Sequence, residues 1–182
     1  MRFTGAVLAG GASRRFGSDK ARYLLDGRPL LARVLDSLAE AGERFVVAGR
    51  PYPEFGVPVH PDLIPGGGPL SGLHAALSLA RHPLVAVAAC DLPYLTPGYW
   101  RLLIAELGGA AAVAALGPGG EPEPLAAVYT QRALPLVEER LRRGGYSLRR
   151  LLGELGARLI PYERVSGELG PGVLTNLNVP PG

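Results

Sequence analysis

Residues 3–20 read FTGAVLAGGASRRFGSDK, an apolar segment that ends at a glycine pair and continues into a loop with three cations. An apolar run that stops at glycines is typical of a buried strand, here expected over residues 3–9. In open α/β sheets, ligands bind beyond the carboxyl ends of the strands. The sequence therefore predicts a strand followed by a phosphate-binding loop, although a flexible, solvated turn explains the same residues.

The loop matches neither common phosphate motif. No Gly-Lys-Ser/Thr closes it, so it is not a P-loop, and Gly10, Gly11 and Gly17 lack the spacing of Gly-x-Gly-x-x-Gly. A longer loop remains, whose backbone amides suit an anion-binding nest. Its side chains add the positive charge that a triphosphate requires, and the predicted set is Arg14, Arg15 and Lys20.

Lys20 is the single lysine among nineteen basic residues. A lysine ammonium is a compact charge with three rotatable donors, whereas an arginine presents a planar fork. The ammonium is therefore suited to a phosphate group whose position or charge changes during a reaction. We expect Lys20 to contact phosphate.

Composition limits the class of protein. The 182 residues are 47% hydrophobic and 19% charged, which predicts one globular domain over residues 1–182. A net charge of +3, scattered arginines and 7% aromatic residues argue against nucleic-acid binding. Cys90 is the single cysteine, so no intrachain disulfide can form. Neither a signal peptide nor a membrane-spanning stretch is evident, and we expect a cytoplasmic protein.

Strands and helices alternate along the chain. We expect strands at residues 3–9, 44–48, 57–59, 84–90, 110–115 and 125–129, and helices at 29–41, 70–81, 97–107 and 132–143. Ser147 is a plausible N-cap of a further helix. This order predicts an α/β fold with a mainly parallel sheet covered by helices on both faces. The remaining residues up to 182 show little periodicity.

Asp91 follows an apolar, non-alternating run over residues 84–90, which is the pattern of a central parallel strand. A carboxylate there is costly unless it is hydrogen-bonded, paired or bound to a cation. Mg²⁺ typically takes one or two protein carboxylates together with phosphate oxygens and water. We predict that Asp91 is a Mg²⁺ ligand; the alternative is that Asp91 or Thr96 caps the following helix.

A second glycine-rich loop spans residues 66–72, with Asp62 ahead of it. Glycines allow a ring or ribose to approach the backbone closely, and Asp62 can accept hydrogen bonds from sugar hydroxyls or a base edge. A solvated loop explains the same composition. Tight packing of a buried helix is a second explanation for Gly72.

The two asparagines of the chain, Asn176 and Asn178, lie two residues apart. On an extended segment they share one face, where their amides would position a substrate. An ordinary turn before the prolines that follow explains them nearly as well.

A basic group at residues 140–150 is either a solvated helix end or a site for an acidic ligand. The three histidines lack metal-ligand spacing, and neither they nor Cys90 is assigned a role.

Taken together, these motifs resemble one family. The segment from Leu8 to Lys20 resembles the N-terminal motif of nucleotidyltransferases that attach a nucleoside monophosphate to a phosphorylated acceptor. With the 68–72 loop, Cys90-Asp91-Leu92-Pro93 and the late Asn-x-Asn, the order and spacing are similar to those of the molybdenum cofactor guanylyltransferases. The resemblance runs from Val7 to Pro180.

The resemblance implies a Rossmann-like three-layer αβα domain that transfers GMP from GTP to molybdopterin with the help of Mg²⁺. It implies nucleotide contacts from Leu8, Ala9, Gly10, Gly11, Lys20, Asp62 and Asp91, and catalytic roles for Lys20, Asp91 and Arg14. It places Gly72, Ser147, Arg149, Asn176 and Asn178 on the acceptor side, together with the strand at Glu123-Pro124-Leu125. Contact with other proteins of molybdenum cofactor synthesis is also implied.

One departure affects base selectivity. Relatives often place an asparagine after the second strand as a guanine-side contact, and this chain has Gly49-Arg50 there. Transfer from CTP, or to another phosphorylated acceptor, therefore stays open as an alternative. A GTP-binding module without turnover is a second alternative from another class of protein.

Overall fold

A seven-stranded sheet forms the centre of the protein. The structure is a computed structural model that describes residues 2–10 and 19–178. The sheet strands are β1 (Thr4–Leu8), β4 (Glu43–Val47), β5 (Val59–His60), β6 (Leu84–Ala89), β7 (Ala112–Leu116), β8 (Pro122–Thr130) and β9 (Arg158–Ile160). Their order across the sheet is β5-β4-β1-β6-β8-β7-β9. All neighbouring pairs are parallel except those that β8 makes with β6 and β7.

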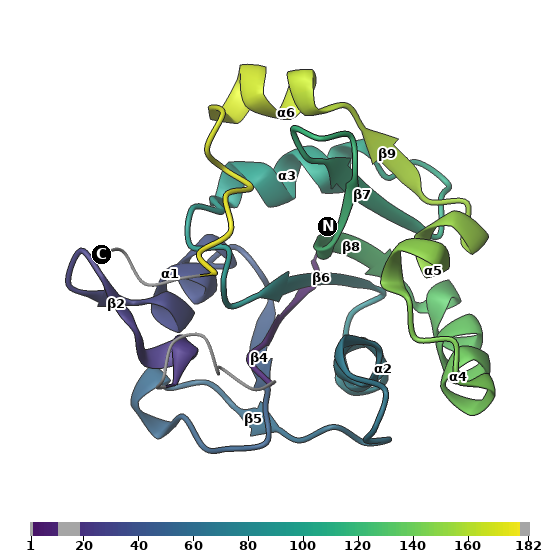
Figure 1. The fold of residues 1–182 in the computed structure, drawn as a ribbon, viewed down its shortest axis with the longest axis horizontal. Helices are drawn as coiled ribbons and strands as arrows, with labels where there is room; N and C mark the ends of the chain where they lie inside the picture. Colours follow the sequence, from purple (N-terminus) through teal and green to yellow (C-terminus); the bar gives the residue numbers. More distant parts are fainter. Residues whose placement is uncertain (1, 11–18, 179–182) are drawn as a thin grey trace.

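Helices cover both faces of this sheet (Figure 1). One face carries α1 (Leu30–Ser37), α3 (Pro97–Glu106) and α6 (Tyr162–Leu169), and the other carries α2 (Pro69–Leu79), α4 (Leu134–Arg143) and α5 (Leu148–Glu154). Two hydrophobic clusters result, one on each face. The predicted three-layer α/β fold with a mainly parallel sheet is confirmed.

Strand β6 shows why its sequence has no polar alternation. Ala86 and Ala88 pack into the cluster beneath α1 and α3, whereas Val85 and Val87 pack into the cluster beneath α2 and α4. Successive side chains of a strand point to opposite faces, so a strand covered on both sides must be apolar throughout. Strand β6 pairs with β1 in parallel, so that Leu8 lies opposite Ala89 at the carboxyl ends of the two strands.

The chain differs from the sequence expectations in several short elements. A two-stranded hairpin, β2 (Leu24–Leu25) with β3 (Arg28–Pro29), precedes α1, so Pro29 caps that helix instead of being its first residue. Strand β9 and helix α6 were not expected. The third strand, expected at residues 57–59, lies at Val59–His60, and β8 begins at Pro122, ahead of the strand expected at residues 125–129.

Among the described residues, no helix has the length and apolar character that crossing a membrane requires. The prediction of one domain over residues 1–182 stays a prediction. The strands of the single seven-stranded sheet are spread over most of the described chain, from Thr4 to Ile160.

Candidate active site

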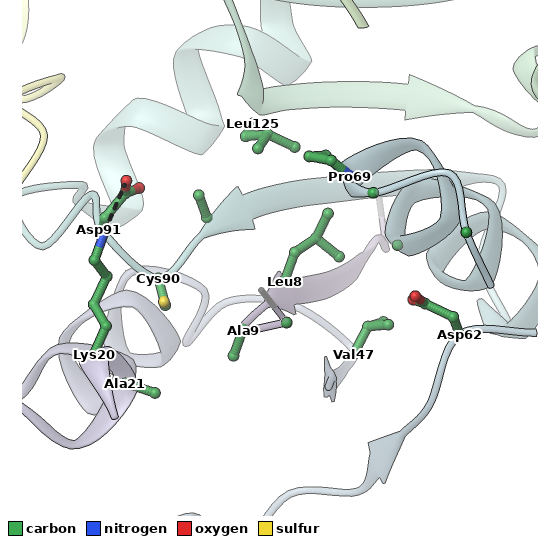
Figure 2. Close-up of a pocket in the computed structure, with 15 residues that line it drawn as sticks. Leu8, Ala9, Lys20, Ala21, Val47, Asp62, Pro69, Cys90, Asp91 and Leu125 are labelled. Atoms are coloured by element: carbon green, nitrogen blue, oxygen red, sulfur yellow. Dashed lines mark ion pairs between the residues drawn. The ribbon is translucent and has the colours of Figure 1, made fainter. Parts of the chain in front are cut away.

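A cavity of about 500 Å³ lies at the carboxyl ends of β1, β4 and β6. Seven of the residues singled out in the sequence line it: Leu8, Ala9, Gly10, Lys20, Asp62, Gly72 and Asp91. Figure 2 shows Lys20 and Asp91 together at one end, Asp62 at the other, and Leu8, Ala9 and Val47 between them. The cavity therefore has a charged end, formed by Lys20 and Asp91, and an opposite end where the carboxylate of Asp62 can accept hydrogen bonds.

The floor of the cavity is backbone from the end of β1. Sheet pairing continues one residue past this strand, since the amide of Ala9 donates a 3.0 Å hydrogen bond to the carbonyl of Val47. On the other side, the amide of Cys90 donates to the carbonyl of Leu8 at 3.3 Å. These bonds fix Leu8 and Ala9 at the cavity. Apart from its chain neighbours, no described residue lies within 4 Å of a Cβ added to Gly10.

Lys20 begins a 3₁₀ turn, η2 (Lys20–Arg22). Asp19 caps this turn, because its Oδ1 accepts a 3.1 Å hydrogen bond from the amide of Ala21. The Lys20 ammonium lies 3.7 Å from Asp91 Oδ2, and the two side chains are 20% and 23% exposed. The predicted cation and the predicted metal carboxylate are thus neighbours.

The environment of Asp91 is unusual for a carboxylate. Burial raises its pKa above the ordinary value, and the positive charge of Lys20 opposes that shift. Of the two residues considered as the cap of the following helix, Thr96 is the one that caps α3: its Oγ1 accepts a 3.3 Å hydrogen bond from the amide of Tyr99, so Asp91 does not serve as that cap. Asp91 is left as a partly buried carboxylate that faces the cavity.

This carboxylate fits a magnesium ion. Among residues 2–10 and 19–178, no group of three or more His, Cys, Asp or Glu side chains could hold a metal by itself. Mg²⁺ does not require such a cage, since it usually keeps several waters and combines one or two carboxylates with substrate phosphates. Burial disfavours the charged form of Asp91, and a cation beside it would relieve that cost.

The C-terminal segment reaches the same place. The amide of Leu177 donates a 2.8 Å hydrogen bond to the carbonyl of Asp91, which brings Asn176 and Asn178 next to the site. In Figure 1 this segment follows α6 and descends toward the end of β6. Both asparagines are exposed, and neither lines the cavity itself.

The other residues predicted on the acceptor side are placed differently. Ser147 caps α5 by accepting a 3.3 Å hydrogen bond from the amide of Arg150, as expected, but it does not line the cavity. Arg149 is 58% exposed and lies 3.4 Å from Glu121. Gly72 does line the cavity, and a Cβ there would lie 2.9 Å from the Leu8 side chain, so close packing also requires this glycine.

Strand β8 adds a second carboxyl group near Asp91. Burial raises the pKa of Glu123, the charge of Asp91 raises it further, and Arg149 lowers it. Leu125, two residues further along, lines the cavity. The strand at Glu123-Pro124-Leu125 therefore borders the charged end of the site.

The basic group at residues 140–150 is mostly occupied by local ion pairs. Arg140 is buried and pairs with Glu154, while Arg143 pairs with Glu139 and Arg149 with Glu121. Cys90 also lines the cavity, but burial raises the pKa of its thiol to about 12, so it stays a neutral side chain.

Two residues at the site were not assigned roles from the sequence. Asp19 caps the turn that carries Lys20, and Tyr52 donates a 3.0 Å hydrogen bond from its hydroxyl to Asp19 Oδ1. An aspartate just before Lys20 is a recognisable N-cap, whereas nothing in the sequence connects Tyr52 to it. The predicted Gly11, Arg14 and Arg15 lie outside the described residues.

Comparison with known proteins identifies the family of this chain. Residues 5–159 match the MobA-like NTP transferase domain. A probable molybdenum cofactor guanylyltransferase of Deinococcus radiodurans is 44% identical over 150 residues, which are 80% of this chain and 77% of the relative. One from Pyrococcus furiosus is 35% identical over 168 residues, covering 87% of this chain and 84% of the relative.

Solved structures show the same architecture. Molybdopterin-guanine dinucleotide biosynthesis protein A from Archaeoglobus fulgidus superposes with a TM-score of 0.83 at 27% identity, covering 97% of this chain and 93% of that one. The 2-C-methyl-D-erythritol 4-phosphate cytidylyltransferase of Thermus thermophilus gives 0.69 at 19% identity, covering 99% and 94%, and shares the fold alone.

The fold is that of a nucleotidyltransferase. The chain belongs to the MobA-like NTP transferase family, among the molybdenum cofactor guanylyltransferases.

Proposed function

We propose that this protein transfers GMP from GTP to the terminal phosphate of the molybdenum–molybdopterin cofactor and releases pyrophosphate. The observation that carries the proposal is the pairing of Lys20 with Asp91, 3.7 Å apart, at one end of a cavity floored by the backbone of Leu8, Ala9 and Gly10. The names of the relatives supply the substrates: they are molybdenum cofactor guanylyltransferases.

The reaction is an in-line attack of a phosphate oxygen on the α-phosphorus of GTP. The bond from the α-phosphorus to the bridging oxygen breaks, and pyrophosphate leaves with its electron pair. The nucleophile is already an anion, so the protein need not supply a general base. Catalysis then rests on positioning and on neutralising charge.

Lys20 supplies the mobile positive charge for the phosphates, and Arg14 is expected to assist it. Asp91 would hold Mg²⁺, which neutralises phosphate charge when bound. The partial burial of Lys20 and Asp91 strengthens their electrostatic effect, because less water screens them.

The nucleoside would extend from this charged end along the cavity toward Asp62 (Figure 2). Backbone groups of Leu8, Ala9 and Gly10, which line the cavity, would meet the base and ribose, and Gly11 is expected to continue this contact. The Asp62 carboxylate can accept hydrogen bonds from ribose hydroxyls or from N–H groups of guanine. Burial raises the pKa of Asp62, and donors from a bound nucleoside would favour its charged form.

The acceptor would enter on the opposite side of Asp91. The backbone hydrogen bond from Leu177 to Asp91 supports acceptor contacts from Asn176 and Asn178, and the charge of Asp91 acting on Glu123 supports the strand at Glu123-Pro124-Leu125. Gly72 remains an expected acceptor-side residue, whereas Ser147 and Arg149 would contribute only if the acceptor extends beyond the cavity. The single cysteine excludes an intrachain disulfide, a feature typical of secreted proteins, and we therefore propose that the reaction takes place in the cytoplasm. Other proteins of molybdenum cofactor synthesis would deliver molybdopterin there.

One observation retains a second candidate function, in which the same reaction transfers CMP from CTP to the acceptor. Arg50, at the position where an asparagine contact to guanine was expected, lies 3.6 Å from Asp19 Oδ2. It is therefore engaged with the turn that carries Lys20, and the guanine-side contact must come from elsewhere. Asp62 is the described carboxylate on the lining that can supply it.

The proposal is tested by incubating purified protein with Mg-GTP and molybdenum–molybdopterin and identifying the product by mass. We expect a guanine dinucleotide cofactor and an equal amount of pyrophosphate, both abolished by a chelator that removes Mg²⁺. Binding of GTP without release of pyrophosphate would instead indicate a nucleotide-binding module without turnover.

A further inference from the structure

We propose that Tyr52 is a positioning residue, which holds Asp19 and through it the turn that presents Lys20 to the cavity. Arg50 supports the same carboxylate. This inference rests on the proposed function, because it assigns Lys20 a phosphate to meet. Its evidence is a network of contacts between two segments that are distant in sequence, the η2 turn and the loop that follows β4.

Asp19 is the centre of this network. Its Oδ1 accepts hydrogen bonds from the amide of Ala21 at 3.1 Å and from the hydroxyl of Tyr52 at 3.0 Å. Its Oδ2 lies 3.0 Å from Arg22 and 3.6 Å from Arg50. The carboxylate thus binds its own turn through one oxygen and is shielded by two guanidinium groups on the other. It is 15% exposed, so these contacts meet little competition from water.

Tyr52 is held rigidly. Its side chain is fully buried, its ring packs edge-on against Phe55 at 6.0 Å, and the guanidinium of Arg22 lies 4.6 Å above the ring centre. Burial and the hydrogen bond to Asp19 raise the pKa of Tyr52, so its hydroxyl remains a neutral donor. A fixed donor aimed at Asp19 defines where the capping carboxylate sits.

The loop and the turn are joined by a second set of contacts through Arg22. Its guanidinium donates to Glu54 Oε1 at 2.5 Å and to the carbonyl of Pro51 at 3.0 Å. Glu54 belongs to η3 (Pro53–Phe55), directly after Tyr52. Arg22 is exposed, so these pairs add little stability individually. They keep the loop against the turn, while the buried Tyr52 sets the geometry.

Lys20 needs such support because its ammonium ends a flexible four-carbon stem. The direction of that stem is set by the backbone of η2, a turn of three residues, which is too short to be stable by itself. Charge also matters, because the Asp19 carboxylate is adjacent to Lys20 in the sequence and would compete with phosphate for the Lys20 ammonium. Arg22 and Arg50 pair with this carboxylate and offset its negative charge.

The test removes the Tyr52 hydroxyl with Tyr52→Phe, alone and combined with Lys20→Ala. We expect Tyr52→Phe to lower kcat for GMP transfer about tenfold with a change in KM for GTP of less than about threefold. In the Lys20→Ala background the same substitution should change kcat by less than about twofold, because the residue it acts through is gone. Tyr162→Phe is the matched control, since it removes another tyrosine hydroxyl, which bonds to the carbonyl of Pro171.

An equal loss of kcat in both backgrounds would overturn the proposal, since Tyr52 would then act through general stability. Unchanged kcat in Tyr52→Phe would also overturn it. Thermal unfolding of each variant accompanies the kinetics, so that a poorly folded variant is recognised. Asp19→Ala removes the oxygen that accepts from both the Ala21 amide and the Tyr52 hydroxyl, and it should reproduce the loss of kcat if Tyr52→Phe proves unstable.

A spectroscopic readout separates failure of this inference from failure of the proposed function. Because Lys20 is the only lysine, protein labelled with ¹³C at the lysine ε carbon gives one signal from this residue. We expect Tyr52→Phe to shift that signal and Tyr162→Phe to leave it in place. If the wild-type protein transfers no nucleotide, the proposed function fails, yet the shift still supports positioning; an unmoved signal contradicts positioning whatever the activity.

Discussion

The backbone amide of Leu177 donates a 2.8 Å hydrogen bond to the carbonyl of Asp91. This bond joins the last described segment of the chain to Asp91, which lies two residues beyond the end of the central strand β6. It explains how two exposed asparagines without regular secondary structure come to lie beside the charged end of the cavity.

The first prediction concerns Asn176 and Asn178. Replacing both with alanine should raise KM for the molybdopterin acceptor about tenfold while leaving the affinity for GTP nearly unchanged, because we propose that their amides meet the acceptor, and neither residue lines the cavity that would hold GTP. Steady-state kinetics with each substrate varied separately measures the two effects. Thr175→Ala is the control, since this exposed side chain lies on the same segment. An equal loss of GTP affinity in the double variant would contradict the assignment.

The second prediction concerns Lys20. Lys20→Ala should lower kcat about 10²-fold or more, equivalent to ~2.7 kcal/mol or more of transition-state stabilisation, because no other described side chain is placed to carry its charge to the phosphates. Arg143→Ala removes a 73% exposed cation that does not line the cavity, and it should leave kcat unchanged. Near-normal turnover in a folded Lys20→Ala protein would remove Lys20 from the mechanism.

The third prediction concerns Asp91 and pH. The folded-state pKa of Asp91 is raised, so the folded protein binds this proton more tightly than the unfolded chain. The resulting stability is fully present below the ordinary carboxyl pKa, about 3.9, and is lost as pH rises through the raised value. At pH 7, Asp91→Asn should therefore raise the Tm of the metal-free protein while abolishing GMP transfer.

Thermal unfolding in the presence of a chelator, at pH 7 and near pH 3, measures this effect. The Tm difference between Asp91→Asn and wild type should shrink at about pH 3, below the ordinary carboxyl pKa, where the carboxyl is largely neutral in both states. A lower Tm for Asp91→Asn at pH 7 would mean that its pairing with Lys20 outweighs the burial of its charge.

The fourth prediction concerns the contact between Gly72 and Leu8. An added Cβ would lie 2.9 Å from Leu8 Cδ1, so Gly72→Ala must push the Leu8 side chain aside in the cavity. We expect a several-fold higher KM for GTP and a loss of about 1–3 kcal/mol in the free energy of unfolding. Adding Leu8→Val, which shortens the obstructing side chain, should partly restore nucleotide affinity.

Gly153→Ala is the matched control for this test, because it also lies in a helix and a Cβ there meets nothing within 4 Å. It should leave KM unchanged. If Gly72→Ala behaves like Gly153→Ala, Leu8 does not constrain the nucleotide.

The parts of the fold that could be predicted from sequence are those with a strong local pattern. Strand β6 is apolar on both faces, and α2 is buried along most of its length, so both were recognised. The β2–β3 hairpin was missed because each strand has two residues, although Asp26-Gly27, with φ angles of 51° and 76°, is a typical hairpin turn. Helix α6 was missed because only Val165 of its side chains is buried.

The site residues also fall into those that a local sequence pattern predicts and those that depend on the tertiary fold. Lys20, Asp91 and the Leu8–Gly10 backbone were predicted because they follow adjacent parallel strands, whose carboxyl ends meet at one edge of a sheet. Tyr52 was missed because its role depends on a loop folding back onto Asp19, which no local spacing encodes. Arg149 was expected at the acceptor side, but an exposed helix position allows it to pair with Glu121 instead.

The central claim is transfer of a guanine nucleotide, and it is tested most directly with α-labelled substrates. Purified protein is given labelled Mg-GTP or labelled Mg-CTP together with the molybdenum–molybdopterin cofactor, and label in the cofactor is measured. We predict that label moves from GTP and not from CTP. Transfer from CTP would keep the chemistry at Lys20 and Asp91 but contradict the base assignment, and transfer from neither would contradict the proposed reaction.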